Sequence, residues 1–483
     1  MKMGRPQNDS ISMNVKSDTA PLTFKEKVGY GLGDMASNFY MGFFGLFLLY
    51  YYTDVFGISP AAAATMLLLT KIVDAISDPV MGLIADRTNS RWGRYRPYLL
   101  WVAVPYAVLG YLLFLGPDLS ATGKLVFAYV TYTLVMLAYT AINVPYSALL
   151  AVISPVASER TKATQFRFVF ASLGTLCVGA FATPLVSLLG GGDEVLGFRL
   201  TVALFAVLSV LIFWITFATT RERIKPKPHN SSVGEDFSAL LKNRSWIILV
   251  VTGIFVVVGL IARFASIIFY LKYYMLDEGS RVFLIFDRTA FLTSCGLIGQ
   301  LIGALITPML AARFEKHHLV IGMNLLHAAL LTLCFFIPPD QFTLIVVVHS
   351  LGILTFGVII TLLFSMYTDC AEYGEWSTGK HMAGLTVSAS MFSLKFGSAV
   401  GGALPGFMLA WFGFIANEVQ SESAITGIRL MFNIVPTFFF LVGGLLMLFY
   451  RIDRATLHRV EAELHERRSE SPIDVQLNQD QAK

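Results

Sequence analysis

Long apolar runs alternate with short polar segments along most of the chain. The run from Leu200 to Ala218 carries no charge, and a helix of that length can cross a hydrocarbon core of about 30 Å. A helix in a soluble core shows a polar stripe, and this run has none. The pattern predicts twelve membrane-spanning helices, at residues 30–55, 60–84, 98–116, 124–150, 165–190, 199–219, 246–275, 289–312, 319–338, 341–368, 382–413 and 424–450.

A polar segment separates these spans into two sets of six. Residues 220–245 are rich in Arg, Lys, Pro, Asn and Ser, which indicates a solvated linker. We therefore expect an all-α membrane protein with two pseudo-symmetric six-helix bundles, at 28–219 and 246–450, and polar tails at 1–27 and 451–483. Two repeated halves of this kind commonly hold a transport site near the bilayer midplane.

Lys and Arg are concentrated in alternate loops. The linker and the loops after the second, fourth, eighth and tenth spans contain about three times as many of them as the opposite loops do. Cytoplasmic loops carry this excess in membrane proteins. We therefore predict that both tails and the linker are cytoplasmic.

The composition agrees with lipid as the solvent. Hydrophobic residues make up 55% of the chain and charged residues 14%, against about a quarter charged in a soluble domain. The net charge of +4 is small, and the basic residues form no face for nucleic acid. The four cysteines show no metal-ligand spacing. We expect a multi-pass cell-membrane protein, of the bacterial inner-membrane type, that acts as a monomer without a metal or cofactor.

Three charged residues lie inside the span at 60–84. Lys71, Asp74 and Asp78 follow the spacing i, i+3, i+7, so they share one helix face. Each charge at the bilayer centre costs about 2.5–3.5 kcal/mol, so this face must meet a cavity, a partner or a cation. Two carboxylates with one ammonium leave a spare negative charge, which suits a cation or a transferred proton. A structural Lys–Asp pair is the alternative.

Other polar side chains lie inside apolar spans as well. Arginine offers a planar fork of donors that suits vicinal hydroxyls or a carboxylate, and lysine can donate to sugar oxygens. Pro145 removes a helical donor, and we expect it to loosen the helix where polar groups gather. Helix–helix contacts and structural ion pairs are the alternatives. The residues concerned are Asp34, Asn38, Tyr139, Thr140, Asn143, Ser147, Arg167 and Lys395, with Arg263 too isolated to interpret.

An acidic segment follows the span at 341–368. It contains Asp369 and Glu372 and faces the cytoplasm in the predicted topology. These carboxylates are expected to pair with Arg91 and Arg94 of the basic loop after the second span, and so to close the inner side. A solvated loop is the alternative.

In the stretches that contain these polar residues, the chain resembles the glycoside–pentoside–hexuronide:cation symporter family of the major facilitator superfamily, which includes the melibiose permease. The stretches that carry the resemblance begin at Gly31, Asp74, Arg91, Tyr139, Arg167 and Asp369, and Lys395 completes them.

The resemblance implies roles for individual residues. Asp74, Asp78 and Thr140 match the positions that hold the coupling cation in the melibiose permease, and we add Ser77 to this predicted cation site. Arg167 and Lys395 also match. The predicted sugar contacts are Asn38, Tyr139, Asn143, Ser147, Arg167 and Lys395, and the predicted coupling or gating residues are Asp34, Lys71, Arg91, Arg94, Asp369 and Glu372.

The departures from the permease fall on its sugar site. Asn38 and Asn143 stand where it has aspartates, and Ser147 stands where it has a tryptophan. These changes resemble the glucuronide and xyloside branches more than the galactoside branch. Because two acidic positions are lost, a proton is a candidate for the coupling ion beside sodium.

The resulting expectation is sugar:cation symport by alternating access, driven by a proton or sodium gradient. The family also includes lysolipid symporters, so a lipid-like solute is an alternative. A different class is an intramembrane prenyltransferase, since Asp74-x-x-x-Asp78 resembles a magnesium–diphosphate motif. Such an enzyme needs two acidic clusters, and only one is present. A channel is disfavoured because the sequence shows no ring of pore-lining charges, and a receptor because it shows no soluble sensing domain.

Overall fold

The computed structural model describes residues 21–224, 240–241, 243–277, 279–378, 383–464 and 466. The predicted tails and linker fall largely outside these residues. The described chain forms two compact units. Unit 1 takes the described parts of Met1–His229 and Asp277–Ser294, together with Leu409–Gln420, and unit 2 takes the described remainder.

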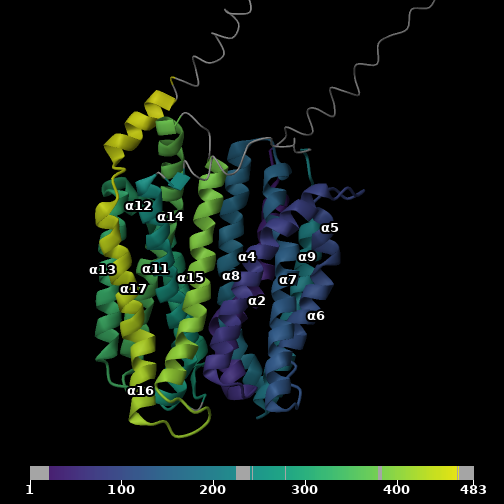
Figure 1. The fold of residues 1–483 in the computed structure, drawn as a ribbon, viewed down its shortest axis with the longest axis vertical. Helices are drawn as coiled ribbons and strands as arrows, with labels where there is room; N and C mark the ends of the chain where they lie inside the picture. Colours follow the sequence, from purple (N-terminus) through teal and green to yellow (C-terminus); the bar gives the residue numbers. More distant parts are fainter. Residues whose placement is uncertain are drawn as a thin grey trace, which may run out of the picture. The chain divides into compact units, whose positions relative to one another are not determined.

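Unit 1 is built from long helices that follow the first six predicted spans (Figure 1). In this unit α2 packs against α8 and α9, and α4 packs against α7. The helices are α2 (Phe24–Leu46), α3 (Leu48–Tyr50), the π-helix η1 (Tyr51–Val55), α4 (Pro60–Arg87), α5 (Arg96–Trp101), α6 (Ala103–Leu113), α7 (Ala121–Ile153), α8 (Ala157–Gly190) and α9 (Glu194–Thr219).

Unit 2 is helical as well and follows the other six predicted spans (Figure 1), except that the first turns of α12 and the last residues of α15 belong to unit 1. Its α13 packs against both α14 and α17, and α11 packs against α17. The helices are α11 (Arg244–Phe269), the π-helix η2 (Tyr270–Tyr274), α12 (Arg288–Arg313), α13 (Lys316–Phe335), α14 (Phe342–Thr378), α15 (Ala383–Trp411), α16 (Glu422–Arg429), the π-helix η3 (Leu430–Ile434), α17 (Val435–Leu446) and the 3₁₀-helix η4 (Met447–Phe449).

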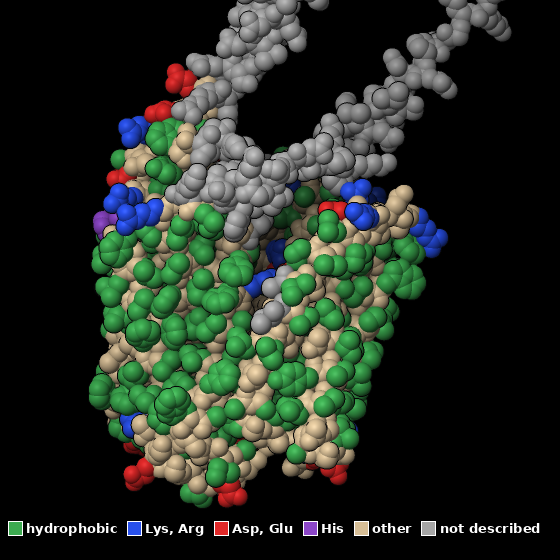
Figure 2. Space-filling model, viewed as in Figure 1, with side chains coloured by type: hydrophobic (Ala, Val, Ile, Leu, Met, Phe, Trp, Pro, Cys, Tyr) green, Lys and Arg blue, Asp and Glu red, His purple; other side chains and the backbone are tan. Residues whose placement is uncertain are grey.

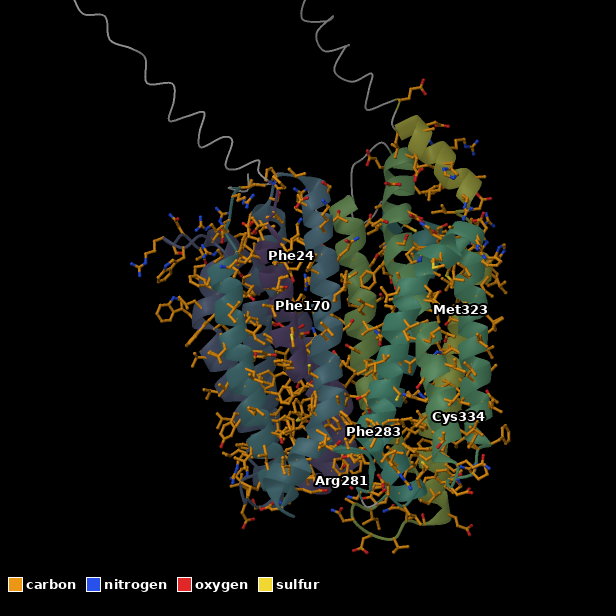
Figure 3. All side chains as sticks on the ribbon, turned by 180° about the vertical axis from the view of Figure 1, so that it is seen from behind. Phe24, Phe170, Arg281, Phe283, Met323 and Cys334 are labelled. Atoms are coloured by element: carbon orange, nitrogen blue, oxygen red, sulfur yellow. The ribbon has the colours of Figure 1, made fainter. Side chains whose placement is uncertain are left out.

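The chain between α11 and α12 forms a short hairpin that belongs to unit 1. Its strands are β1 (Arg281–Phe283) and β2 (Phe286–Asp287), paired antiparallel. The Asp287 carboxylate accepts hydrogen bonds from the Thr183 hydroxyl of α8 at 2.9 Å and from the Ala290 N–H at 2.8 Å. Figure 3 shows Arg281 and Phe283 toward one end of unit 1 and Phe24 toward the other.

Within the described residues, eight helices are long and apolar enough to cross a membrane, or nine if the bent α2–α3–η1 stretch is one span. On the face drawn in Figure 2, hydrophobic side chains cover most of each unit, and most of the visible Lys and Arg lie toward its upper end. Helix α4 is not among the eight. Its large apolar side chains still form one exposed stripe that includes Leu69, Val73, Ile76, Val80 and Leu83, which is the pattern of a helix with one face in lipid.

Two of the predicted spans are interrupted. The first bends by 55° after Leu46, where Phe47 leaves the helical conformation (φ −125°, ψ −16°). The third divides at Val102 into α5 and α6. The expected loosening at Pro145 does not interrupt the helix, because α7 continues from Ala121 to Ile153 with Pro145 inside it. No proline lies near Phe47, so the first break has no such signal in the sequence. Pro105 lies three residues after Val102 and has no N–H to donate to the carbonyl oxygen of Trp101, which accounts for the second break.

Close helix packing in unit 2 depends on two glycines. A Cβ at Gly303 of α12 would lie 2.0 Å from the carbonyl oxygen of Leu354 on α14. A Cβ at Gly357 of α14 would lie 2.1 Å from the carbonyl oxygen of Gln300 on α12. Small residues allow helix backbones to approach in this way in membrane proteins. The pairing of α12 with α14 therefore requires glycine at both positions.

Candidate functional site

Two carboxylates of α4 converge on one hydroxyl of α7. The Thr140 hydroxyl lies 2.9 Å from Oδ1 of Asp74 and 3.2 Å from Oδ1 of Asp78. The Ser77 hydroxyl lies 3.3 Å from the Thr140 hydroxyl oxygen and 3.1 Å from the Asp74 carbonyl oxygen. Four side chains from two packed helices thus bring oxygen atoms together inside unit 1.

The position of this cluster follows from the two faces of α4. Asp74 is only 3% exposed, although Val73 beside it is 37% exposed and Ile76 is 66% exposed. Asp78, Ser77 and Lys71 are half-buried. The apolar stripe points outward, and Asp74 and Asp78 on the other side of α4 contact Thr140 of α7.

The oxygen cluster has the chemistry of a site for a monovalent cation or a proton. The Thr140 hydroxyl has a single hydrogen, so it can donate to only one of the two aspartates at a time. Two carboxylates that share a site repel each other, and either a bound cation or one added proton relieves that repulsion. Burial strengthens the effect, because the interior screens charge less than water does.

A second polar cluster lies between α2 and α8. Nε of Arg167 lies 2.9 Å from Oδ2 of Asp34. The Arg167 guanidinium also lies over the Tyr146 ring, 5.0 Å from its centroid. The Tyr146 hydroxyl donates to the carbonyl oxygen of Tyr30, and the two tyrosine rings are stacked at 4.9 Å. Arg167 is therefore held in one orientation, with 21% of its side chain exposed.

Amide and hydroxyl groups lie near this ion pair. The Asn38 amide donates to the carbonyl oxygen of Asp34 at 2.8 Å. The Asn143 amide is 3.5 Å from the Ser37 hydroxyl, and the Ser147 hydroxyl is 3.5 Å from the Asn143 side-chain oxygen. Contacts of that length are weak hydrogen bonds. The half-buried groups of Asn143 and Ser147 could exchange them for hydroxyls of a solute.

The structure places the remaining predicted site residues in different surroundings. Tyr139 is half-buried on α7, with its ring 6.3 Å from the ring of Tyr106. Lys395 is half-buried on α15 in unit 2. Its part in a sugar site stays a prediction.

The predicted gating residues have local contacts within their own units. In unit 2, Asp369 forms an ion pair with Lys316 at 2.6 Å, and Glu372 is half-buried on the same helix. In unit 1, the Arg91 guanidinium lies 4.2 Å from the centroid of the Trp92 ring. Pairing of Asp369 and Glu372 with Arg91 and Arg94 stays a prediction.

Two buried or half-buried charged residues have roles that the sequence did not indicate. Arg263 of α11 is fully buried, and its guanidinium donates to Nδ1 of His349 at 3.1 and 3.3 Å and to the carbonyl oxygen of Phe432. Glu222, just after α9, accepts hydrogen bonds from three backbone N–H groups. A single acidic residue between Arg221 and Arg223 was the only signal for Glu222.

Comparison with known proteins gives a consistent match over nearly the whole chain. The family described as MFS/sugar transport protein matches residues 29–454. The chain is 36% identical over 427 residues to the inner membrane symporter YicJ of Escherichia coli (strain K12), covering 88% of this chain and 91% of the relative. It is 33% identical over 452 residues to the putative glycoside/cation symporter YagG of the same organism, covering 93% and 96%.

Solved structures show the same fold at low sequence identity. The crystal structure of the nucleoside transporter NupG superimposes with a TM-score of 0.61 at 14% identity, covering 89% of this chain and all of that one. At that identity the likeness concerns the fold alone. The matches are to transporters, so the prenyltransferase alternative has no support.

Proposed function

Because the chain belongs to the MFS/sugar transport protein family, we propose that it is a secondary active transporter that carries a sugar together with a cation. It is a multi-pass protein of the cell membrane and not an enzyme. The relative YagG, named a putative glycoside/cation symporter, supports a glycoside, pentoside or hexuronide as the solute.

The observation that carries the proposal is the oxygen cluster of Asp74, Asp78, Thr140 and Ser77. One buried and one half-buried carboxylate within a membrane helix are costly, and a bound cation lowers that cost. With the Lys71 ammonium on the same helix face, one monovalent ion balances the charge of the two carboxylates and makes the loaded carrier free to change conformation. Either a proton or sodium serves this purpose, and no further cofactor is needed.

The proposed sugar contacts are grouped around the ion pair of Arg167 and Asp34. Asn38, Asn143 and Ser147 offer amide and hydroxyl groups, and Arg167 offers a planar fork of donors. Such a set suits a polyol, and Arg167 also suits the carboxylate of a hexuronide. Tyr139 supplies an aromatic surface on the same helix as Asn143.

Alternating access is the mechanism that fits this family best. We propose twelve spans in two six-helix halves, with both termini in the cytoplasm, because Lys and Arg are concentrated in the linker and in every second loop. The halves would take turns in exposing the bound solute and ion to each side of a bacterial inner membrane. The chain is proposed to act as a monomer.

Uptake into proteoliposomes of purified protein tests the proposal. Labelled glycosides, pentosides and hexuronides are offered under an imposed sodium gradient, a pH gradient or neither. We expect accumulation of at least one sugar with one of the two gradients. Accumulation of a lysolipid, with no uptake of any sugar, would contradict the proposed solute.

Asp74→Asn tests the role of the oxygen cluster in coupling. It should abolish accumulation against a gradient and leave exchange of solute across the membrane measurable, because the solute contacts are intact. Uphill uptake by Asp74→Asn at the wild-type level would overturn the assignment of the cation site.

A further inference from the structure

We propose that Glu222 is a positioning residue for transport, whose carboxylate fixes the basic loop between α4 and α5. The inference rests on the proposed function, because the loop carries Arg91 and Arg94, the predicted gating residues. Glu222 lies three residues after the end of α9, where the chain leaves unit 1 toward the linker. Nothing in the resemblance assigns it a role.

Glu222 makes its contacts with three consecutive backbone N–H groups of the loop. One carboxylate oxygen accepts from the N–H of Arg94 at 2.8 Å. The other accepts from the N–H of Tyr95 at 2.7 Å and of Arg96 at 3.1 Å. Arg96 begins α5, and the first N–H groups of a helix have no partner within it. Glu222 therefore supplies the acceptor that this helix start lacks.

The loop backbone is shaped to receive the carboxylate. Gly93 has a φ of +107°, which an L-residue rarely adopts. A Cβ at this position would lie 2.5 Å from the carboxyl carbon of Glu222. The Ser90 hydroxyl donates to the carbonyl oxygen of Gly93 at 2.6 Å and closes the turn on the other side. Gly93 thus allows both the turn and the approach of Glu222.

The residues that follow Glu222 attach the same segment to two more helices. The backbone N–H of Arg223 donates to the carbonyl oxygen of Val152, near the end of α7, at 2.8 Å. The Arg223 guanidinium pairs with Glu26, in the first turn of α2, at 2.6 Å. The segment 222–223 therefore joins the ends of α2, α7 and α9 to the loop before α5. These described contacts of residues 222 and 223 all lie within unit 1.

The basic side chains of the loop are arranged on this backbone. The guanidinium of Arg96 donates to the carbonyl oxygen of Phe217 on α9 at 2.7 Å and lies over the Phe217 ring. Arg91 stacks on Trp92, and the Trp92 ring lies 6.3 Å from the Phe217 ring. Loss of the Glu222 carboxylate would release the backbone that carries these side chains. Gating by Arg91 and Arg94 requires that this backbone keeps its place.

Amide hydrogen exchange of the full-length protein in lipid nanodiscs tests the contact directly. In Glu222→Ala, the amides of residues 94–96 should exchange at least about tenfold faster than in the wild type, because hydrogen bonds to a charged group are lost. Glu222→Gln retains one acceptor oxygen and should restore part of the protection. Glu194→Ala is the matched control, because it removes a carboxylate at the start of α9 that accepts from the Tyr50 hydroxyl and not from the loop before α5.

Transport by the same variants tests the functional part of the inference. In proteoliposomes, Glu222→Ala should lower the maximal rate of sugar uptake about tenfold per reconstituted molecule and change the half-saturating sugar concentration by less than about twofold. Glu222→Gln should recover much of the rate. A residue that only stabilises the fold would lower the amount of inserted protein and leave the rate per molecule unchanged.

The outcomes separate this inference from the proposed function. Exchange of residues 94–96 at the wild-type rate in Glu222→Ala would overturn the inference, as would faster exchange with an unchanged maximal rate. A wild-type protein that carries none of the sugars would overturn the proposed function instead, and the exchange comparison would still decide whether Glu222 holds the loop. If Glu222→Ala fails to insert, exchange and uptake in Glu222→Gln decide the question, with intermediate values expected.

Discussion

Removal of the Thr140 hydroxyl is the sharpest test of the oxygen cluster. Thr140→Val keeps the shape and β-branching of the side chain and removes only the oxygen on which Asp74 and Asp78 converge, at 2.9 and 3.2 Å. If this oxygen binds the coupling ion with the two carboxylates, the substitution should weaken ion binding and leave the solute contacts of Asn143 and Arg167 in place.

The size of the effect follows from the interaction that is lost. A contact between a hydroxyl and a charged group contributes about 1.5–3 kcal/mol. At about 1.4 kcal/mol per factor of ten, this corresponds to an increase of about 10- to 150-fold in the half-saturating sodium concentration if sodium is the coupling ion. If a proton is the coupling ion, the shift has the opposite sign, because the hydroxyl donates to the ionised carboxylates and its loss favours their protonated form. With saturating ion, the half-saturating concentration of the sugar should change little.

The assay is sugar uptake into proteoliposomes as a function of sodium concentration and of external pH. Thr131→Val is the matched control, because Thr131 is a buried threonine of the same helix whose hydroxyl donates to the backbone oxygen of Phe127 at 2.7 Å. Thr140→Ser keeps the oxygen and should resemble the wild type. An ion dependence of Thr140→Val within about twofold of the wild type, or an equal shift in Thr131→Val, would refute the reasoning.

Three further predictions concern the stability of the purified protein. A double-mutant cycle of Asp34→Asn and Arg167→Gln should give a coupling of about 1–2 kcal/mol in unfolding experiments, because the pair is largely buried at 2.9 Å; additive effects would contradict the ion pair. Gly303→Ala should destabilise the protein by about 1–3 kcal/mol through overpacking against α14. Gly322→Ala on α13 is the control: a Cβ there meets open space, so the substitution should be neutral or slightly stabilising. Similar melting temperatures for the two variants would be inconsistent with the close α12–α14 contact. Burial raises the pKa of Asp287 above its usual 3.8, so the stability that this group contributes is fully present below pH 3.8 and is lost as the pH rises through the higher folded-state pKa. Asp287→Asn should therefore have a higher melting temperature than the wild type near neutral pH, and the difference should shrink on acidification. A difference that grows in acid would contradict the raised pKa.

The helical content and the inward direction of the α4 charges were predictable from the sequence. Both follow from local rules, since apolar runs of sufficient length become helices in lipid and a face with Lys71, Asp74 and Asp78 cannot point outward without a large cost. The observed burial of Asp74 and the exposed stripe on the other side of α4 agree with that reasoning. The resemblance also indicated Thr140 as a partner, and the structure brings its hydroxyl to both aspartates.

The partners of the other charged residues were decided by tertiary structure. Asp34 and Arg167 are 133 positions apart, and no local pattern shows that α2 packs against α8. The role of Glu222 could not be predicted from the sequence, because its carboxylate binds backbone N–H groups. Every residue except proline has such a group, so no residue type identifies the partners. The break at Phe47 likewise has no proline near it, unlike the break at Val102, which lies three residues before Pro105. Periodicity along one helix reports which face is apolar, whereas the choice of neighbour depends on contacts between segments that are distant in the chain.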